Sequence, residues 1–214
     1  MSHLKKIAMP RSWPLKKTGT KYIVKARPGI GNGTSIPILL VLRDMLHVAS
    51  TRSEVKQIIF MKDVMINGRV INDDKFPAGL FDIITLHKLK KSYKIIFLKN
   101  GKLGIEESKE AENKISKVIG KKILKGNKQQ INLLDGSNIL SKEKVKVNDS
   151  IIFSLKDKKL VKVMPLKEKA DVYIIGGKHI GEKGTIEKID ARQAIIKIEK
   201  KSVNIQLNNI FVMD

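Results

Sequence analysis

The sequence has no cysteine and only four histidines. Without cysteine the chain forms no disulfide, no cysteine-ligated zinc site and no iron–sulfur cluster, and it has no thiol nucleophile. The histidines (His3, His47, His87 and His179) are scattered, and no two of them have the i, i+4 spacing of a helical metal-binding pair. We therefore expect neither a metal nor a cofactor, and no catalytic residues.

Long hydrophobic runs are also missing. The longest apolar stretch, residues 36–42, is interrupted by Pro37, whereas a membrane-spanning helix needs about 20 apolar residues. The N-terminal segment has no sustained apolar region and no small-residue cleavage site, so we expect no signal peptide. The positive charge does not follow one face of an amphipathic helix, which argues against a membrane surface as the partner.

Basic residues are what the chain has in excess. Among its 214 residues, 43 lysines and arginines stand against 21 aspartates and glutamates, which gives a formal net charge of +22. The hydrophobic content of 42% is sufficient for folded cores, and the length allows one large domain or two to three small ones. A charge so far from zero indicates a polyanionic partner, and nucleic acid is the leading one.

The charge is uneven along the chain. Residues 1–40 contain eight basic and no acidic residues, and residues 92–165 contain seventeen basic and eight acidic ones. We interpret residues 1–37 as a basic N-terminal arm that does not fold alone and becomes ordered along a phosphate backbone; a solvated tail is the alternative. Aromatic residues are only 5% of the chain and lysines far outnumber arginines, so neutralisation of the backbone should outweigh base stacking and base reading.

Residues 38–91 predict a small helix-and-hairpin domain. Apolar residues at helical spacing predict a helix over 38–49. The pattern from Thr51 to Glu54 is that of a capping box, which predicts a second helix from there to about residue 61. Asn67-Gly68 lies between two β-branched runs and predicts a tight hairpin, and residues 83–86 predict a further strand.

Residues 92–214 predict mostly short strands. Residues 92–166 are expected to form a β-rich middle domain, with a short helix near Ser108 that buries Ala111 and Ile115, and with hairpins at Asp135-Gly136 and at residues 156–159. Residues 167–214 predict about five strands, the content of an SH3-like barrel, with a glycine-rich loop between the first two. The fold class is therefore α+β, mostly β.

The helix that begins after Thr51 carries the first group of candidate RNA-binding residues. A helix N-terminus favours phosphate, and Arg52 and Lys56 lie four residues apart on one flank near it. The candidates that extend this surface are Lys62, Asn67, Arg69 and Lys75. The alternative is a solvated helix face, paired with Glu54 and Asp63.

Two segments resemble known RNA-binding motifs. Residues 51–84, TRSEVKQIIFMKDVMINGRVINDDKFPAGLFDII, resemble the alpha-L RNA-binding motif in their Thr-Arg-Ser start, Ile-Asn-Gly hairpin and late Gly-x-x-Asp-Ile-Ile. The motif usually has glycine and aspartate adjacent, whereas Gly79 and Asp82 follow the spacing of one branch. Residues 171–198 resemble a KOW motif, in which a glycine permits a sharp turn. That resemblance implies that Lys178, His179 and Lys183 face RNA.

These motifs follow a basic arm reading HLKKIAMPRSWP and precede a C-terminal NNIFVMD, a combination that resembles the archaeal and eukaryotic small-subunit ribosomal protein family S4e. The resemblance implies a structural ribosomal protein of the cytoplasm, bound to small-subunit rRNA beside neighbouring ribosomal proteins. Its candidate RNA-binding residues in the arm are Lys5, Lys6, Arg11, Trp13, Lys16 and Lys17. Trp13 either stacks on a base or packs the arm against the first domain.

Two alternatives use the same RNA-binding modules. An RNA-modifying enzyme carrying an alpha-L motif would need a catalytic domain, and lysine is the most frequent polar residue of 92–165. An elongation factor with KOW barrels would leave the alpha-L segment unexplained.

Overall fold

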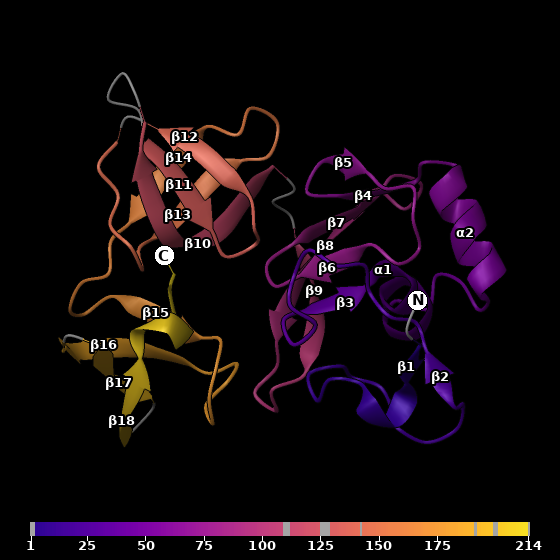
Figure 1. The fold of residues 1–214 in the computed structure, drawn as a ribbon, viewed down its shortest axis with the longest axis horizontal. Helices are drawn as coiled ribbons and strands as arrows, with labels where there is room; N and C mark the ends of the chain where they lie inside the picture. The colour runs from indigo at the N-terminus through magenta and orange to yellow at the C-terminus, as the bar shows by residue number, and fades with distance from the viewer. Residues whose placement is uncertain are drawn as a thin grey trace. The chain divides into compact units, whose positions relative to one another are not determined.

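The computed structural model describes residues 3–108, 112–124, 129–141, 143–190, 192–198 and 201–213. It is mostly β with few helices, which confirms the predicted fold class. The chain divides into two compact units (Figure 1). The first unit contains residues 1–96 and 102–111, and the second contains residues 97–101 and 112–214.

A five-stranded sheet with the order β5-β4-β7-β8-β9 is the centre of the first unit. Its strands are β4 (Val64–Ile66), β5 (Arg69–Val70), β7 (Ile83–Leu86), β8 (Lys91–Phe97, whose last residue belongs to the second unit) and β9 (Leu103–Ser108). The predicted hairpin between β4 and β5 is confirmed. Its turn residues Asn67 and Gly68 have φ values of 51° and 72°, which these two residue types tolerate best.

Two helical segments flank this sheet. Helix α1 (Ile38–Leu40) continues as a π-helical segment over Val41–Met45, so the predicted helix over 38–49 is too long. The Leu46 N–H donates to the carbonyl of Val41, and His47 then takes a positive φ of 53°, which ends the helix. Helix α2 (Arg52–Phe60) begins at the predicted capping box.

The N-terminal arm is part of the first unit. Strands β1 (Leu4–Lys5) and β2 (Tyr22–Ile23) pair with each other, and β3 (Ser35–Pro37) pairs with β6 (Pro77–Gly79). Met9, Trp13 and Ala26 are buried, and the Trp13 indole N–H donates to the carbonyl of Ser35 at 2.8 Å. The expectation that the arm stays unfolded until it binds is therefore wrong, because these few apolar residues dock it onto the core.

The first sheet of the second unit has the order β12-β11-β10-β13-β14. Its strands are β10 (Asn113–Ile123), β11 (Gln129–Leu133), β12 (Asn138–Ser141), β13 (Ser150–Ser154) and β14 (Leu160–Met164), and both predicted hairpins are confirmed. The predicted helix near Ser108 is wrong: Ser108 ends β9, and Ile115 lies in β10 opposite Ile152 of β13. Ala111 lies outside the described residues.

The C-terminal sheet has the order β18-β17-β16-β15-β19. It consists of β15 (Asp171–Ile174), β16 (Lys183–Ile189), β17 (Gln193–Ile198), β18 (Lys201–Gln206) and β19 (Ile210–Val212), as the sequence predicts. The second unit has two hydrophobic clusters. One lies around Ile131 and Ile151, and the other lies around Ile174 and Ile196 and also includes Met164 of β14.

The expected boundary after residue 91 falls between paired strands. Residues 83–86 of β7 pair with residues 91–94 of β8, and β9 continues the same sheet. The first unit therefore extends through β9 to residue 111, apart from residues 97–101. The finer division of the chain into arm, alpha-L, middle and KOW domains stays a prediction, to which the separate hydrophobic clusters lend support.

Candidate nucleic-acid interface

Local hydrogen bonds fix the start of α2. The Thr51 hydroxyl accepts from the Glu54 N–H at 3.3 Å, and the Glu54 carboxylate accepts from the N–H groups of Ser50 and Thr51. The bond from Ser50 is the main cause of a lowered pKa at Glu54, which keeps this carboxylate charged. Val55 and Ile59 are buried, so the helix presents a defined outer face to solvent.

Arg52 is committed to a buried carboxylate. Its Nε donates to Asp74 Oδ2 at 2.6 Å; Asp74 is only 5% exposed, while the Arg52 side chain is 45% exposed. Burial alone raises the pKa of Asp74, but the hydrogen bond and charge of Arg52 outweigh it, so the pKa is lowered. The anticipated pairing with Glu54 or Asp63 does not form; Asp63 pairs with Lys88 at 2.8 Å.

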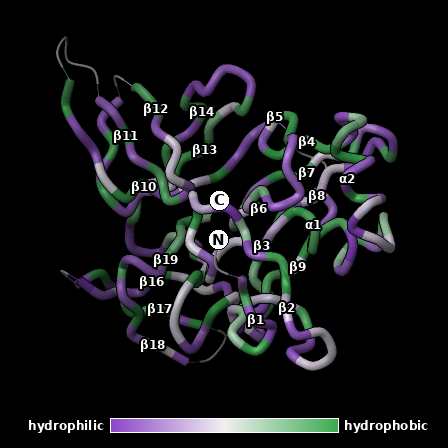
Figure 2. Tube along the Cα trace, turned by 45° about the vertical axis from the view of Figure 1, so that its right-hand side comes forward, coloured by the Kyte–Doolittle hydropathy of each residue, from purple (hydrophilic) through white to green (hydrophobic). Residues whose placement is uncertain are grey.

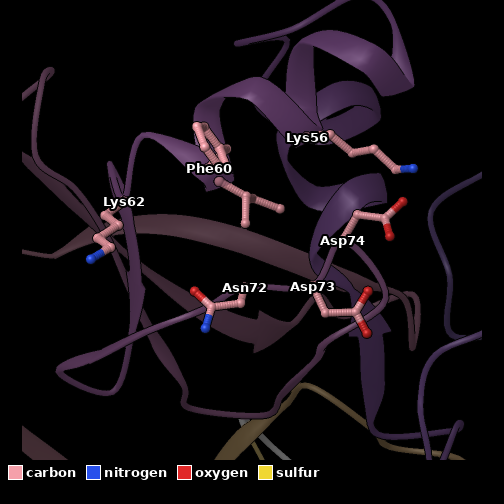
Figure 3. A pocket seen from close by; sticks show the side chains of 7 residues that line it. Lys56, Phe60, Lys62, Asn72, Asp73 and Asp74 are labelled. Carbon is pink, nitrogen blue, oxygen red and sulfur yellow. The ribbon is translucent and has the colours of Figure 1, made fainter.

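A depression of about 550 Å³ lies beside the C-terminal half of α2 (Figure 3). Lys56, Ile59 and Phe60 of α2 line it together with Lys62 and the turn at residues 72–74. The structure therefore brings Lys56 and Lys62, two of the predicted RNA-binding residues, to one concave site. The sequence analysis missed Phe60, although an apolar residue next to Ile59 on this helix lies off the face that Val55 and Ile59 bury.

Asn67 holds the fold together instead of facing outward. Its Nδ2 donates to Asp82 Oδ1 at 2.8 Å, and its Oδ1 accepts from the Ile83 N–H at 3.0 Å. Asp82 Oδ2 also accepts from the Gly79 N–H at 2.6 Å, which explains the spacing of the Gly-x-x-Asp segment. Since both atoms of its amide are engaged, Asn67 is a poor RNA-binding candidate, whereas Arg69 at the other end of the turn is exposed.

The turn after β5 joins the arm to α2. Lys75 is half-buried; its carbonyl accepts from the Arg27 N–H at 2.9 Å and its own N–H donates to Asp73 at 3.2 Å. The Arg27 side chain forms an ion pair with Asp73. Arg27 and Asp73 were missed by the sequence analysis, because nothing local to either residue predicts a partner 46 positions away.

The basic side chains of the arm are mostly available to a partner. Lys5, Arg11, Lys16 and Lys17 are exposed, while Lys6 Nζ donates to the carbonyl of Thr18 at 2.8 Å. Trp13 is 1% exposed, so base stacking by Trp13 is ruled out and the packing alternative is correct. In Figure 1, β1 and β2 lie at the lower end of the first unit, well away from α2.

The candidates of the glycine-rich loop lie in the second unit. Lys178 and Lys183 are exposed, and His179 Nδ1 lies 2.9 Å from Glu182 Oε2. Gly181 turns the loop with a φ of 85°, and a Cβ there would collide with the carbonyl of Leu98. The glycine is therefore needed both for the turn and for the close approach of residues 97–101.

Other classes of site find little support in the described ranges. Within them, no three histidine, aspartate or glutamate residues gather so as to hold a metal ion. No helix in the part of the chain that the structure covers is long and apolar enough to cross a membrane. Figure 2 shows hydrophilic and hydrophobic segments alternating along the chain. Small β modules with lysines distributed over their surfaces are typical of proteins that bind nucleic acid.

Comparison with known proteins identifies the family. Residues 89–160 match the family described as "Ribosomal family S4e". The chain is 38% identical over 185 residues to small ribosomal subunit protein eS4 of Archaeoglobus fulgidus, covering 86% of this chain and 79% of the relative. The Nanoarchaeum equitans protein of the same name is 34% identical and covers 87% and 82%. The chain belongs to the S4e family of ribosomal proteins.

A solved structure agrees. The crystal structure of the 30S ribosomal protein S4e from Thermoplasma acidophilum superposes with a TM-score of 0.73 at 25% identity, over 84% of this chain and 95% of that one. Family membership makes the chain a structural component of the translation machinery in the cytoplasm, not an enzyme. It gives no support to an RNA-modifying enzyme or an elongation factor, and it confirms the resemblance drawn from the sequence.

Proposed function

We propose that this chain binds the rRNA of the small ribosomal subunit, beside neighbouring ribosomal proteins, and that most of its contacts are to backbone phosphates. The observation that carries this is the net charge of +22, most of it on exposed lysines, in a chain whose relatives are named small ribosomal subunit proteins. Lysine is a mobile point charge that suits phosphate, whereas base edges are read mainly by planar side chains.

Three surfaces would share the binding. They are the arm with Lys5, Lys16 and Lys17, the surface beside α2 with Lys56 and Lys62, and the glycine-rich loop with Lys178 and Lys183. Each is built on a folded module, so the contacts are placed by the fold and not by an extended tail. The arm is held by Trp13, and the loop turns at Gly181.

The salt dependence of binding tests the proposal. Titration of transcribed small-subunit rRNA at several KCl concentrations should give an affinity that falls by roughly 10³- to 10⁵-fold from about 50 to 200 mM, as expected for about 6–10 phosphate contacts. The double change Lys16→Ala with Lys17→Ala should make the plot of log affinity against log salt concentration less steep, by the amount expected for about two lost phosphate contacts. It should not change stability, because both side chains are exposed.

A paired lysine provides the control. Lys156 Nζ is exposed but forms an ion pair with Glu112 at 2.6 Å, so Lys156→Ala should leave the slope nearly unchanged. Affinity that does not vary with salt would contradict binding through phosphates. Equal affinity for a large-subunit rRNA segment of the same length would contradict the small subunit as the target.

A further inference from the structure

Phe60 is exposed to an extent unusual for an aromatic residue. As the last residue of α2 it has 87% of its surface in solvent, more than any other large hydrophobic side chain in the described ranges. It packs against no core, since the buried face of the helix consists of Val55 and Ile59. Nothing in the stability of the first unit therefore requires a phenyl ring at this position.

The ring stands at the edge of the depression beside α2. Ile59, which is 4% exposed, lines the same depression, and Asn72 lies across from Phe60 (Figure 3). Lys56 lies one helical turn before Phe60, and Lys62 follows at the end of the helix, where its φ of 59° turns the chain. The depression thus combines an aromatic face, an amide and two flanking cations.

The carboxylates of the depression are already neutralised. Asp74 pairs with Arg52 and Asp73 pairs with Arg27, whereas neither Lys56 nor Lys62 forms an ion pair with a described residue. The two lysines therefore leave the rim with a net positive charge. An apolar surface for a protein partner would show several adjacent exposed apolar side chains, and the lining here contributes only Phe60 as an exposed one.

We propose that this depression takes a single unstacked RNA base, which stacks on the Phe60 ring while its flanking phosphates lie against Lys56 and Lys62. The volume of about 550 Å³ lies within the usual range for small-ligand pockets. The Asn72 amide supplies one donor and one acceptor group for the edge of the base. This site rests on the proposed function, and it adds one point of base contact to a surface that otherwise binds phosphates.

A series of substitutions at Phe60 tests the site, with the full-length protein and transcribed small-subunit rRNA in the absence of other proteins. Phe60→Ala should weaken binding by roughly 5- to 150-fold, the usual range for loss of one aromatic stack. Phe60→Leu should weaken it nearly as much, and Phe60→Trp should retain it. Ile7→Ala, at an apolar residue 78% exposed in the arm, is the matched control and should have no effect.

Two further measurements separate the alternatives. Phe60→Ala should leave the unfolding transition and the salt dependence of rRNA affinity unchanged. The double change Lys56→Ala with Lys62→Ala should weaken that salt dependence by the amount expected for about two lost phosphate contacts. Ultraviolet crosslinking should join a nucleotide to the peptide that contains Phe60.

Three results would overturn the site. If all Phe60 variants bind rRNA equally, no base stacks there. If Phe60→Leu restores full affinity, the contact is apolar packing, and a protein partner becomes the better occupant. If the unmodified chain binds no rRNA, the proposed function itself fails, a result that differs from the first two because it removes binding in every variant.

Discussion

Lys114 and Lys117 lie in β10 with only 2% of their surface exposed. Lys114 Nζ is 2.5 Å from Oδ2 of Asp135, which lies in the turn between β11 and β12. Lys117 Nζ donates to the carbonyl oxygens of Leu207 and Ile210, at 2.5 and 2.8 Å. These two lysines join parts of the second unit, so they add nothing to the proposed RNA-binding surface.

The carboxylate beside Lys114 is held in its charged form. Burial alone raises the pKa of Asp135, but the charge and hydrogen bond of Lys114, with two further bonds from Ser137, outweigh burial and lower it. A carboxylate whose pKa is lowered by folding stabilises the native state above its unfolded pKa, and this contribution is lost as the pH falls through the folded pKa. The second unit should therefore lose stability in acid.

Lys117 gives a pH dependence of the opposite kind. Burial lowers its pKa to about 8 from the ordinary 10.5, so between these values the unfolded chain binds more protons than the native one. Stability should therefore rise with pH across this window, by at most about 3 kcal/mol, because two carbonyl acceptors favour the charged form. Urea unfolding of wild type and Lys117→Met from pH 7.5 to about 10.5 measures this.

The difference in unfolding free energy between wild type and Lys117→Met isolates Lys117, since every other lysine titrates in both proteins. The increase in stability with pH should be smaller in Lys117→Met. Parallel stability curves would show that Lys117 keeps its ordinary pKa in the folded chain.

At the level of single residues, the sequence predicts the kind of charge but not its partner. Lys5, Lys16, Lys56 and Lys62 are surface cations as expected. Arg52 cannot be distinguished from Lys56 by sequence, because its acidic partner is 22 residues away and is brought near only by the fold. The sequence likewise predicts Asn67 only as a turn residue, because the hydrogen bond that its side-chain amide donates needs Asp82, 15 residues further along the chain.

The sequence correctly predicts the helices and strands whose ends are determined by residues close together in the chain. The capping box of α2 involves residues three apart, and the hairpins at Asn67-Gly68 and Asp135-Gly136 depend on their own backbone angles. The pairs β1–β2 and β3–β6 are strands of two or three residues, too short for an alternating pattern to show.

Helix α2 contains one cation that is paired with a buried carboxylate, Arg52, and one exposed cation, Lys56, so their effects on stability can be compared. Arg52→Ala should destabilise the first unit by about 1–2 kcal/mol, because it leaves the buried Asp74 carboxylate without its partner, although partial exposure of Arg52 reduces the loss. Lys56→Ala, one turn further along the same helix, should change stability by less than about 0.5 kcal/mol. Thermal or urea unfolding of each variant provides the measurement.

A second change confirms the cause. Adding Asp74→Asn to Arg52→Ala should recover part of the lost stability, since no buried charge then remains. A loss in Lys56→Ala as large as in Arg52→Ala would mean that the Arg52–Asp74 pair is not what holds the helix.

In the whole molecule, the two units are interleaved along the chain. Residues 97–101 belong to the second unit although residues 96 and 102 belong to the first. The Tyr173 hydroxyl donates to the carbonyl of Phe97 at 2.5 Å and accepts from its N–H at 2.9 Å. A domain boundary predicted after residue 91 misses this arrangement. The pattern of a strand in the sequence does not show that the turn after β8 belongs to a different unit from the strand itself.

Fragments that differ by this segment should differ in stability. A fragment of residues 112–214 lacks the Phe97 backbone groups that bond to the Tyr173 hydroxyl, and it loses these two hydrogen bonds, each of which contributes about 0.5–1.5 kcal/mol. A fragment of residues 97–214 should therefore unfold at higher urea concentration. Tyr173→Phe should lower the stability of the longer fragment and have little effect on the shorter one; equal stability of the two fragments would show that residues 97–101 do not support this unit.

The interleaving also orders events in time. Phe97 is synthesised 76 residues before Tyr173, so the contact between them cannot form until β15, the first strand of the C-terminal sheet, has been made. The first unit consists of residues that precede residue 112. During synthesis the proposed RNA-binding surface beside α2 can therefore be made before the glycine-rich loop.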